Sequence, residues 1–233
     1  MNKADLRRWF IVFFTAVFLV SVFASASHAL VPDKKEWQKK KKEFGLKDGL
    51  SKVKMGDEFQ RYTDDMSASQ SKENKNFAER IPYIDRLDGK IEVYIKAVKK
   101  KDKKNTAAVQ YLEGVQGDLA DMKKTLNGII DSGNTVKDLI EKAKTAYAGY
   151  DANTDKTTLA NFWSQEMRAI GTTTPLLVQK DKVFAPEHKA FKTAINEVKK
   201  LIETSPFDAV ATIALIKKSV VDLESGLDEK GAW

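Results

Sequence analysis

The stretch TAAVQYLEGVQGDLADMKKTLNGII, residues 106–130, decides the fold class. Its apolar residues alternate steps of four and three without a gap: Ala108, Leu112, Val115, Leu119, Met122, Leu126 and Ile129. Such a sustained heptad lies along one face of an α-helix. One apolar face is buried only against other helices, so the stretch predicts the core of a helical bundle, with an intermolecular coiled coil as the alternative.

Helical spacing continues on both sides of this stretch. Before it, Pro82 is expected at the start of a helix or at a kink, and Asn105 is the expected N-cap of the heptad helix. After it, the turn residues 131–134 are expected to end that helix, and the segment 171–175, GTTTP, is expected to break a later one.

Two further helix starts are readable near the C-terminus. Pro186 stands at the expected first position of one helix, and Ser205, followed by Pro206, is the expected cap of the last. Trp233 follows two residues after a glycine, which favours a loosely packed tail. No segment alternates with period two, so we expect an all-α, elongated bundle of five or six helices with a four-helix-bundle-like core.

Residues 1–29 have the features of an export signal. Lys3, Arg7 and Arg8 precede an uncharged apolar run, and small residues end at Ala26 and Ala29, where a signal peptidase would cut. The uncharged stretch 9–32 is also long enough for a retained anchor, which needs about 20 residues. The many lysines just after it would pull such an anchor toward a cytoplasmic body, so cleavage is the favoured reading.

Charge then divides the remainder into a Lys-rich N-terminal arm, residues 30–72, and a helical bundle domain, residues 73–233. Residues 33–54 hold nine lysines against four acids, whereas basic and acidic residues balance from Met55 onward. The candidate partner-binding or membrane-binding residues of the arm are Lys34, Lys35, Trp37, Lys39, Lys40, Lys41, Lys42 and Phe44. Lysines can bind an anionic surface while aromatic rings insert at the interface.

The chain has few or none of the residues that several kinds of catalytic, metal and nucleic-acid-binding site require. The chain has no cysteine, which excludes disulfides, thiolate catalysis and Cys-ligated metals. His188 is the single histidine outside the leader, too few for a di-iron bundle site, and no Gly-x-Ser-x-Gly elbow accompanies it. The segment 151–155 begins like a calcium loop but lacks the later ligands, which favours a structural turn. Lysines far outnumber arginines, which disfavours nucleic-acid recognition.

These observations predict an exported, non-enzymatic binding or scaffolding protein, without a cofactor, at an acidic membrane surface or an extracytoplasmic face of a membrane complex. Its amphipathic helices also allow self-association. One alternative is a ligand or haem carrier that binds between helices, with His188 and a methionine as haem ligands. Another is a membrane-tethered cytoplasmic helical protein that uses the same arm.

Overall fold

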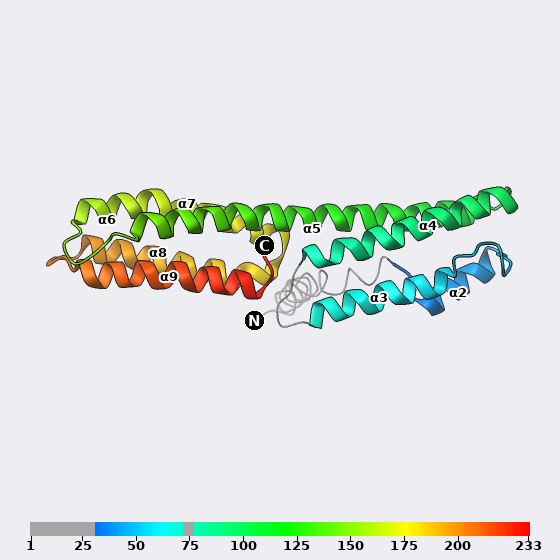
Figure 1. Cartoon of the computed structure of the whole chain (residues 1–233), viewed down its shortest axis with the longest axis horizontal. Coiled ribbons are helices and arrows are strands. Elements are labelled where there is room, and N and C mark those ends of the chain that lie inside the picture. Colours follow the sequence, from blue (N-terminus) through cyan, green and yellow to red (C-terminus); the bar gives the residue numbers. More distant parts are fainter. Residues whose placement is uncertain (1–30, 72–76) are drawn as a thin grey trace, which may run out of the picture. The chain divides into compact units, whose positions relative to one another are not determined.

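The computed structural model describes residues 31–71 and 77–233, with the side chain of Ser71 left aside. The expected export signal, residues 1–29, lies outside the described residues. The described residues form helices, turns and loops and no strand, which confirms the all-α prediction (Figure 1). None of their helices combines the length and the apolarity needed to cross a bilayer.

The described chain forms two compact units. Unit 1 comprises residues 31–70 and 79–124, and unit 2 comprises residues 71, 77–78 and 125–233. Helix α5 (Thr106–Tyr147) contributes its first half to unit 1 and its second half to unit 2. This division differs from the expected arm of residues 30–72 followed by a bundle domain, because the Lys-rich segment is itself part of unit 1.

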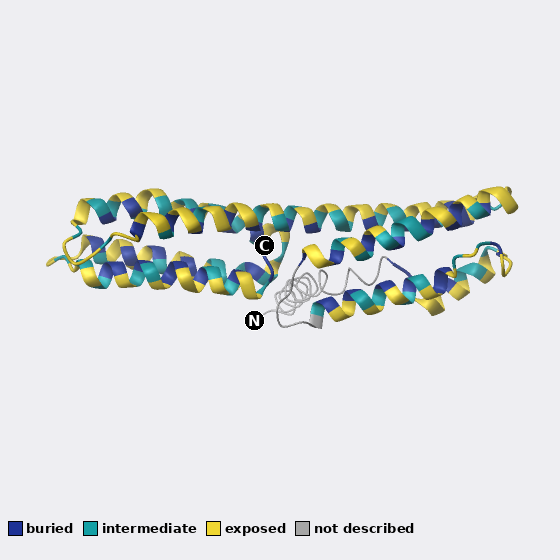
Figure 2. Ribbon diagram, in the orientation of Figure 1, coloured by how far each residue is buried: buried dark blue, intermediate teal, exposed yellow. Residues whose placement is uncertain are grey.

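Unit 1 contains α2 (Lys34–Glu43), α3 (Met55–Ser71), α4 (Ile81–Lys101) and the first half of α5. A short 3-10 turn, η1 (Ala78–Arg80), precedes α4. Pro82 lies in the first turn of α4, as expected. Buried residues recur along each of these helices between exposed ones (Figure 2). Ion pairs join the helices at the edges, with Arg86 of α4 2.6 Å from Asp65 of α3.

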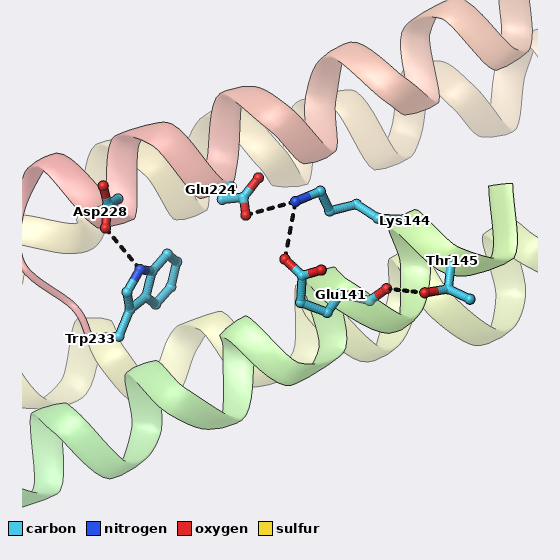
Figure 3. Close-up of polar contacts among 6 residues, drawn as sticks. All are labelled: Glu141, Lys144, Thr145, Glu224, Asp228 and Trp233. Atoms are coloured by element: carbon cyan, nitrogen blue, oxygen red, sulfur yellow. Dashed lines mark hydrogen bonds and ion pairs between the residues drawn. The ribbon is translucent and has the colours of Figure 1, made fainter. Parts of the chain in front are cut away.

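Unit 2 contains the second half of α5, then α6 (Lys156–Phe162), the π-helical turn η2 (Trp163–Met167), α7 (Arg168–Lys180), η3 (Lys182–Phe184), α8 (Ala185–Glu203) and α9 (Ala209–Glu229). Because α6, η2 and α7 follow one another without a break, unit 2 has four helical rods, which is the expected four-helix core. Lys144 of α5 bridges Glu141 and Glu224, at 3.0 and 2.9 Å, and so ties α5 to α9 (Figure 3).

The prediction that residues 131–134 end a helix is wrong, since α5 continues through them. Ser132 donates its hydroxyl to Gly128 O at 2.7 Å, so its side chain bonds within the helix instead of closing a turn. A Cβ atom on Gly133 would lie 1.6 Å from Ala232 O. The glycine therefore provides room for the C-terminal tail, and does not supply a turn.

That tail is packed, contrary to expectation. Gly231 turns the chain with a φ of +70°, and Ala232 is fully buried. The indole Nε1 of Trp233 donates to Asp228 at 3.0 Å (Figure 3). Lys137 of α5 places its ammonium 5.5 Å from the centroid of the same ring. The turn at Gly231, the burial of Ala232 and the two contacts of Trp233 thus hold the last three residues against the rest of unit 2.

The expected break at residues 171–175 is also wrong, because α7 runs through it. Pro175 has no N–H to donate to Gly171 O, four residues earlier. The hydroxyl of Thr174 lies 3.5 Å from that carbonyl and 2.8 Å from His188 Nδ1. A Cβ on Gly171 would lie 2.4 Å from Ile195 Cδ1 of α8, so this glycine serves close helix packing.

Two of the three helix starts expected from Asn105, Pro186 and Ser205 agree with the structure. Asn105 Oδ1 accepts a hydrogen bond from Ala108 N at 3.3 Å at the start of α5, and Pro186 lies in the first turn of α8. The cap of the last helix is Asp208 and not Ser205, since Asp208 accepts from Ala211 N at 2.9 Å. Because α9 begins at Ala209, Asp208 occupies the N-cap position, and Ser205 lies three residues before that position.

Candidate cationic interface

The Lys-rich segment begins as a capped, packed helix. Asp33 Oδ1 accepts a hydrogen bond from Glu36 N at 2.7 Å and so starts α2. Gly45 ends it with a φ of +63°, and Leu46 N donates back to Lys41 O at 3.0 Å. This closing bond is the Schellman pattern that favours glycine after a helix.

Trp37 holds α2 against the rest of unit 1. Its side chain is 2% exposed, and its ring centroid lies 5.5 Å from that of Phe59, 5.7 Å from Tyr94 and 6.4 Å from Tyr111. The expectation that Trp37 is free to insert at an interface therefore does not hold in this structure. Burial of a large ring among three aromatic neighbours stabilises unit 1 more than exposure would.

Phe44, the second aromatic of the segment, is half-buried at the end of α2. Its ring centroid lies 5.6 Å from that of Tyr111, and the ammonium of Lys40 lies 5.8 Å from its centroid. Phe44 thus keeps part of its ring at the surface, which Trp37 does not.

The six lysines of the predicted site differ in exposure and in partners. Exposed are Lys34, Lys35, Lys39 and Lys42, and half-buried are Lys40 and Lys41. The ion pairs are Lys34 with Asp57 at 2.7 Å, Lys40 with Glu43 at 3.1 Å, and Lys41 with Asp48. Within the described residues, the remaining three lysines have no carboxylate partner.

A second lysine cluster, which the sequence does not connect to the first, lies beside it. Asn105 Nδ2 donates to Phe44 O at 2.8 Å, and Lys101 Nζ donates to Gly49 O at 3.4 Å. These bonds join the α4–α5 turn to the α2–α3 loop. Residues 39–54 hold seven lysines against two acids, and residues 96–104 hold six against one. We call these two segments together the cationic end of unit 1.

The cationic end holds thirteen lysines against three acidic residues, so its formal charge is positive although its carboxylates are paired or ionised. A hydrogen bond from Lys41 holds the pKa of Asp48 below its usual value, and Lys34 does the same for Asp57. Burial, aided by Glu36 and Glu43, raises the pKa of Tyr111 to about 12. Its phenol is therefore neutral and contributes no negative charge beside the lysines.

The candidate calcium and haem ligands make contacts within the protein. Asp151 Oδ1 accepts from Asn153 N at 2.8 Å and closes a turn, and Asp155 caps α6 through Thr158 N at 2.9 Å. His188 is half-buried, and its burial, followed by the charge of Lys192, lowers its pKa. No group of three or more potential metal ligands occurs in the described part of the chain.

The chain matches no known protein family, no curated protein and no solved structure. The cationic end is thus characterised by its own geometry and charge alone.

Proposed function

We propose that the protein is an exported, non-enzymatic binding protein whose cationic end attaches unit 1 to an anionic membrane surface. The observation that carries the proposal is the convergence of residues 39–54 and 96–104 on one end of unit 1. The export part of the proposal rests on the sequence of residues 1–29. The non-enzymatic part rests on the hydrogen bonds that His188, Asp151 and Asp155 make within the protein.

Lysine-dominated surfaces favour an anionic lipid surface over a specific protein groove. Lysine ammoniums are hydrated point charges on flexible stems, so they bind diffuse negative charge without fixed geometry. Each lysine near an anionic bilayer contributes about 1 kcal/mol. Several unpaired lysines therefore suffice for attachment, and Phe44, which is partly exposed, adds an apolar contact.

The test is cosedimentation with vesicles at rising salt. Vesicles with phosphatidylglycerol are expected to bind the protein at low salt and to release it as the ionic strength rises. The variant set removes four exposed lysines that lack carboxylate partners in the described structure, through substitution by glutamine of Lys42, Lys100, Lys103 and Lys104. Four such losses correspond to roughly 4 kcal/mol, or up to about a thousandfold in partitioning.

A matched control removes the same net charge from unit 2, through substitution by glutamine of Lys142, Lys156, Lys189 and Lys200, which are exposed and have no ion pair among the described residues. This control is expected to bind nearly as the parent does. Equal losses in both sets would mean that net charge alone matters, and binding that ignores salt would overturn the proposal. Binding to a membrane complex but not to lipid vesicles would assign the contact to a protein.

A further inference from the structure

A groove lies beside Trp37 in unit 1, within the cationic end. Its volume is about 500 Å³, within the range of about 300–1,000 Å³ that is typical of small-ligand pockets. Its buried lining residues are Trp37, Leu50, Met55 and Tyr94. Its lysines are Lys41, Lys47, Lys52 and Lys54. The groove therefore combines an apolar floor with cationic walls.

The positive charge of this groove is not balanced. The two carboxylates that line it are already paired, Asp48 with Lys41 and Asp57 with Lys34, which lies outside the lining. Three lining lysines have no carboxylate within ion-pair distance among the described residues: Lys47, Lys52 and Lys54. Lys54 acts on Asp57 only through space. Three lysines that line one groove thus have no carboxylate counterion among the described residues.

The loop that carries these lysines is held in place by glycine turns, buried leucines and a hydrogen bond from Lys101. Gly45 and Gly49 take φ values of +63° and +75°, which sharp turns require. Leu46 and Leu50 are buried and anchor the loop from below, and Lys101 donates to Gly49 O. On the α3 side, a Cβ on Gly56 would lie 3.3 Å from Trp37 Cδ1, so the wall there is tight.

We infer that this groove binds a phosphate monoester, either as a lipid headgroup or on a soluble molecule. A phosphate monoester carries about −1.5 to −2 charges at pH 7 and three strong acceptor oxygens, which suits three unpaired ammonium groups. A carboxylate or a phosphodiester carries a single charge and therefore leaves more of the cationic charge uncompensated than a phosphate monoester does. The lipid form of this inference rests on the proposed function and specifies the lipid chemistry that the cationic end prefers.

The test compares two vesicle types in phosphate-free buffer, with phosphatidic acid or phosphatidylglycerol at matched zeta potential. The groove variant substitutes Lys47, Lys52 and Lys54 by glutamine. The control variant removes the same charge from the last turn of α4 and the α4–α5 turn, outside the groove lining, by substitution of Lys100, Lys103 and Lys104 by glutamine. All positions are exposed, so circular dichroism and thermal midpoints should stay at the parent values.

The parent and the control are each expected to bind phosphatidic acid at least about tenfold more tightly than phosphatidylglycerol. The control should bind both lipids more weakly than the parent, because it lacks three lysines of the cationic end. The groove variant should lose that preference while it keeps salt-sensitive binding to both lipids. A parent without the preference, or a groove variant that retains it, would overturn the lipid form of the inference and leave the proposed function intact. Failure of the parent to bind either lipid would instead contradict the proposed function.

Soluble glycerol 3-phosphate separates the two sources of the ligand. Titration calorimetry without vesicles that shows binding by the parent and the control, but not by the groove variant, supports a soluble phosphate monoester even where vesicle binding fails. Absence of this binding together with a retained lipid preference assigns the phosphate to a membrane headgroup. Absence of both results rejects the inference.

Discussion

The docked C-terminal tail makes a sharp prediction for Gly133→Ala. In a free helix this change stabilises by about 1 kcal/mol, because alanine has the higher helix propensity. Here the new methyl would lie 1.6 Å from Ala232 O, a distance that only displacement of the tail relieves. Displacement breaks the hydrogen bond from Trp233 to Asp228, about 1 kcal/mol, and removes Lys137 from the ring, about 0.5–1 kcal/mol.

Exposure of the buried Ala232 adds about 1 kcal/mol, so the net expectation is destabilisation by roughly 1–2 kcal/mol. Urea unfolding followed by circular dichroism measures it, and faster release of Trp233 by carboxypeptidase reports tail displacement. Gly117→Ala is the matched control, because it lies in the same helix with nothing within 4 Å of its Cβ. It should stabilise by about 0.5–1 kcal/mol. Equal stabilisation by both changes would refute the docked tail.

Three further predictions concern α2, the last helix cap and the half-buried phenol of Tyr111. Trp37→Ala should lower the free energy of unfolding in urea by about 3–5 kcal/mol. Lys39→Gln, on the exposed face of the same helix, should lower it by under about 0.5 kcal/mol. Similarly small effects of both changes would contradict the packing of α2. Asp208→Ala should cost about 1 kcal/mol in thermal unfolding and Ser205→Ala almost nothing, and the reverse order would restore serine as the cap. Because burial raises the pKa of Tyr111 to about 12 from 10.0, the folded state keeps its proton longer than the unfolded chain does. Its contribution to stability is full below pH 10 and is lost as the pH rises toward 12, so Tyr111→Phe should make unfolding free energies between pH 9 and 12 less pH-dependent; an unchanged slope would count against this.

The helices were predictable where periodicity alone decides them. Six of the seven heptad residues between 108 and 129 are buried along α5, and Met122 is half-buried. Pro82 and Pro186 lie in the first turns of their helices as expected. Gly133 and Pro175 wrongly predict helix breaks, because the local preference of glycine and proline for turns is weaker than the tertiary contacts of these segments. Ala232 occupies space that is free only because Gly133 has no side chain. No local sequence pattern indicates a contact between residues 99 positions apart.

The candidate site was predictable in charge but not in geometry. The lysines of residues 34–42 mark a cationic segment from composition alone, yet an interfacial helix and a packed helix share the same amphipathic pattern. The burial of Trp37 depends on Phe59, Tyr94 and Tyr111, which come from three other helices. Likewise, the bond from Lys101 to Gly49 that joins the two lysine clusters links positions that no spacing rule relates.

Attachment through the cationic end is tested most directly by site-specific labelling, because the chain has no cysteine and each label is unique. Lys103→Cys and Lys142→Cys, each carrying an environment-sensitive fluorophore, probe the cationic end and unit 2. Anionic vesicles should shift the emission at position 103 to shorter wavelength, and salt should reverse the shift, while position 142 stays unchanged. A shift at position 142 with none at position 103 would contradict attachment through the cationic end.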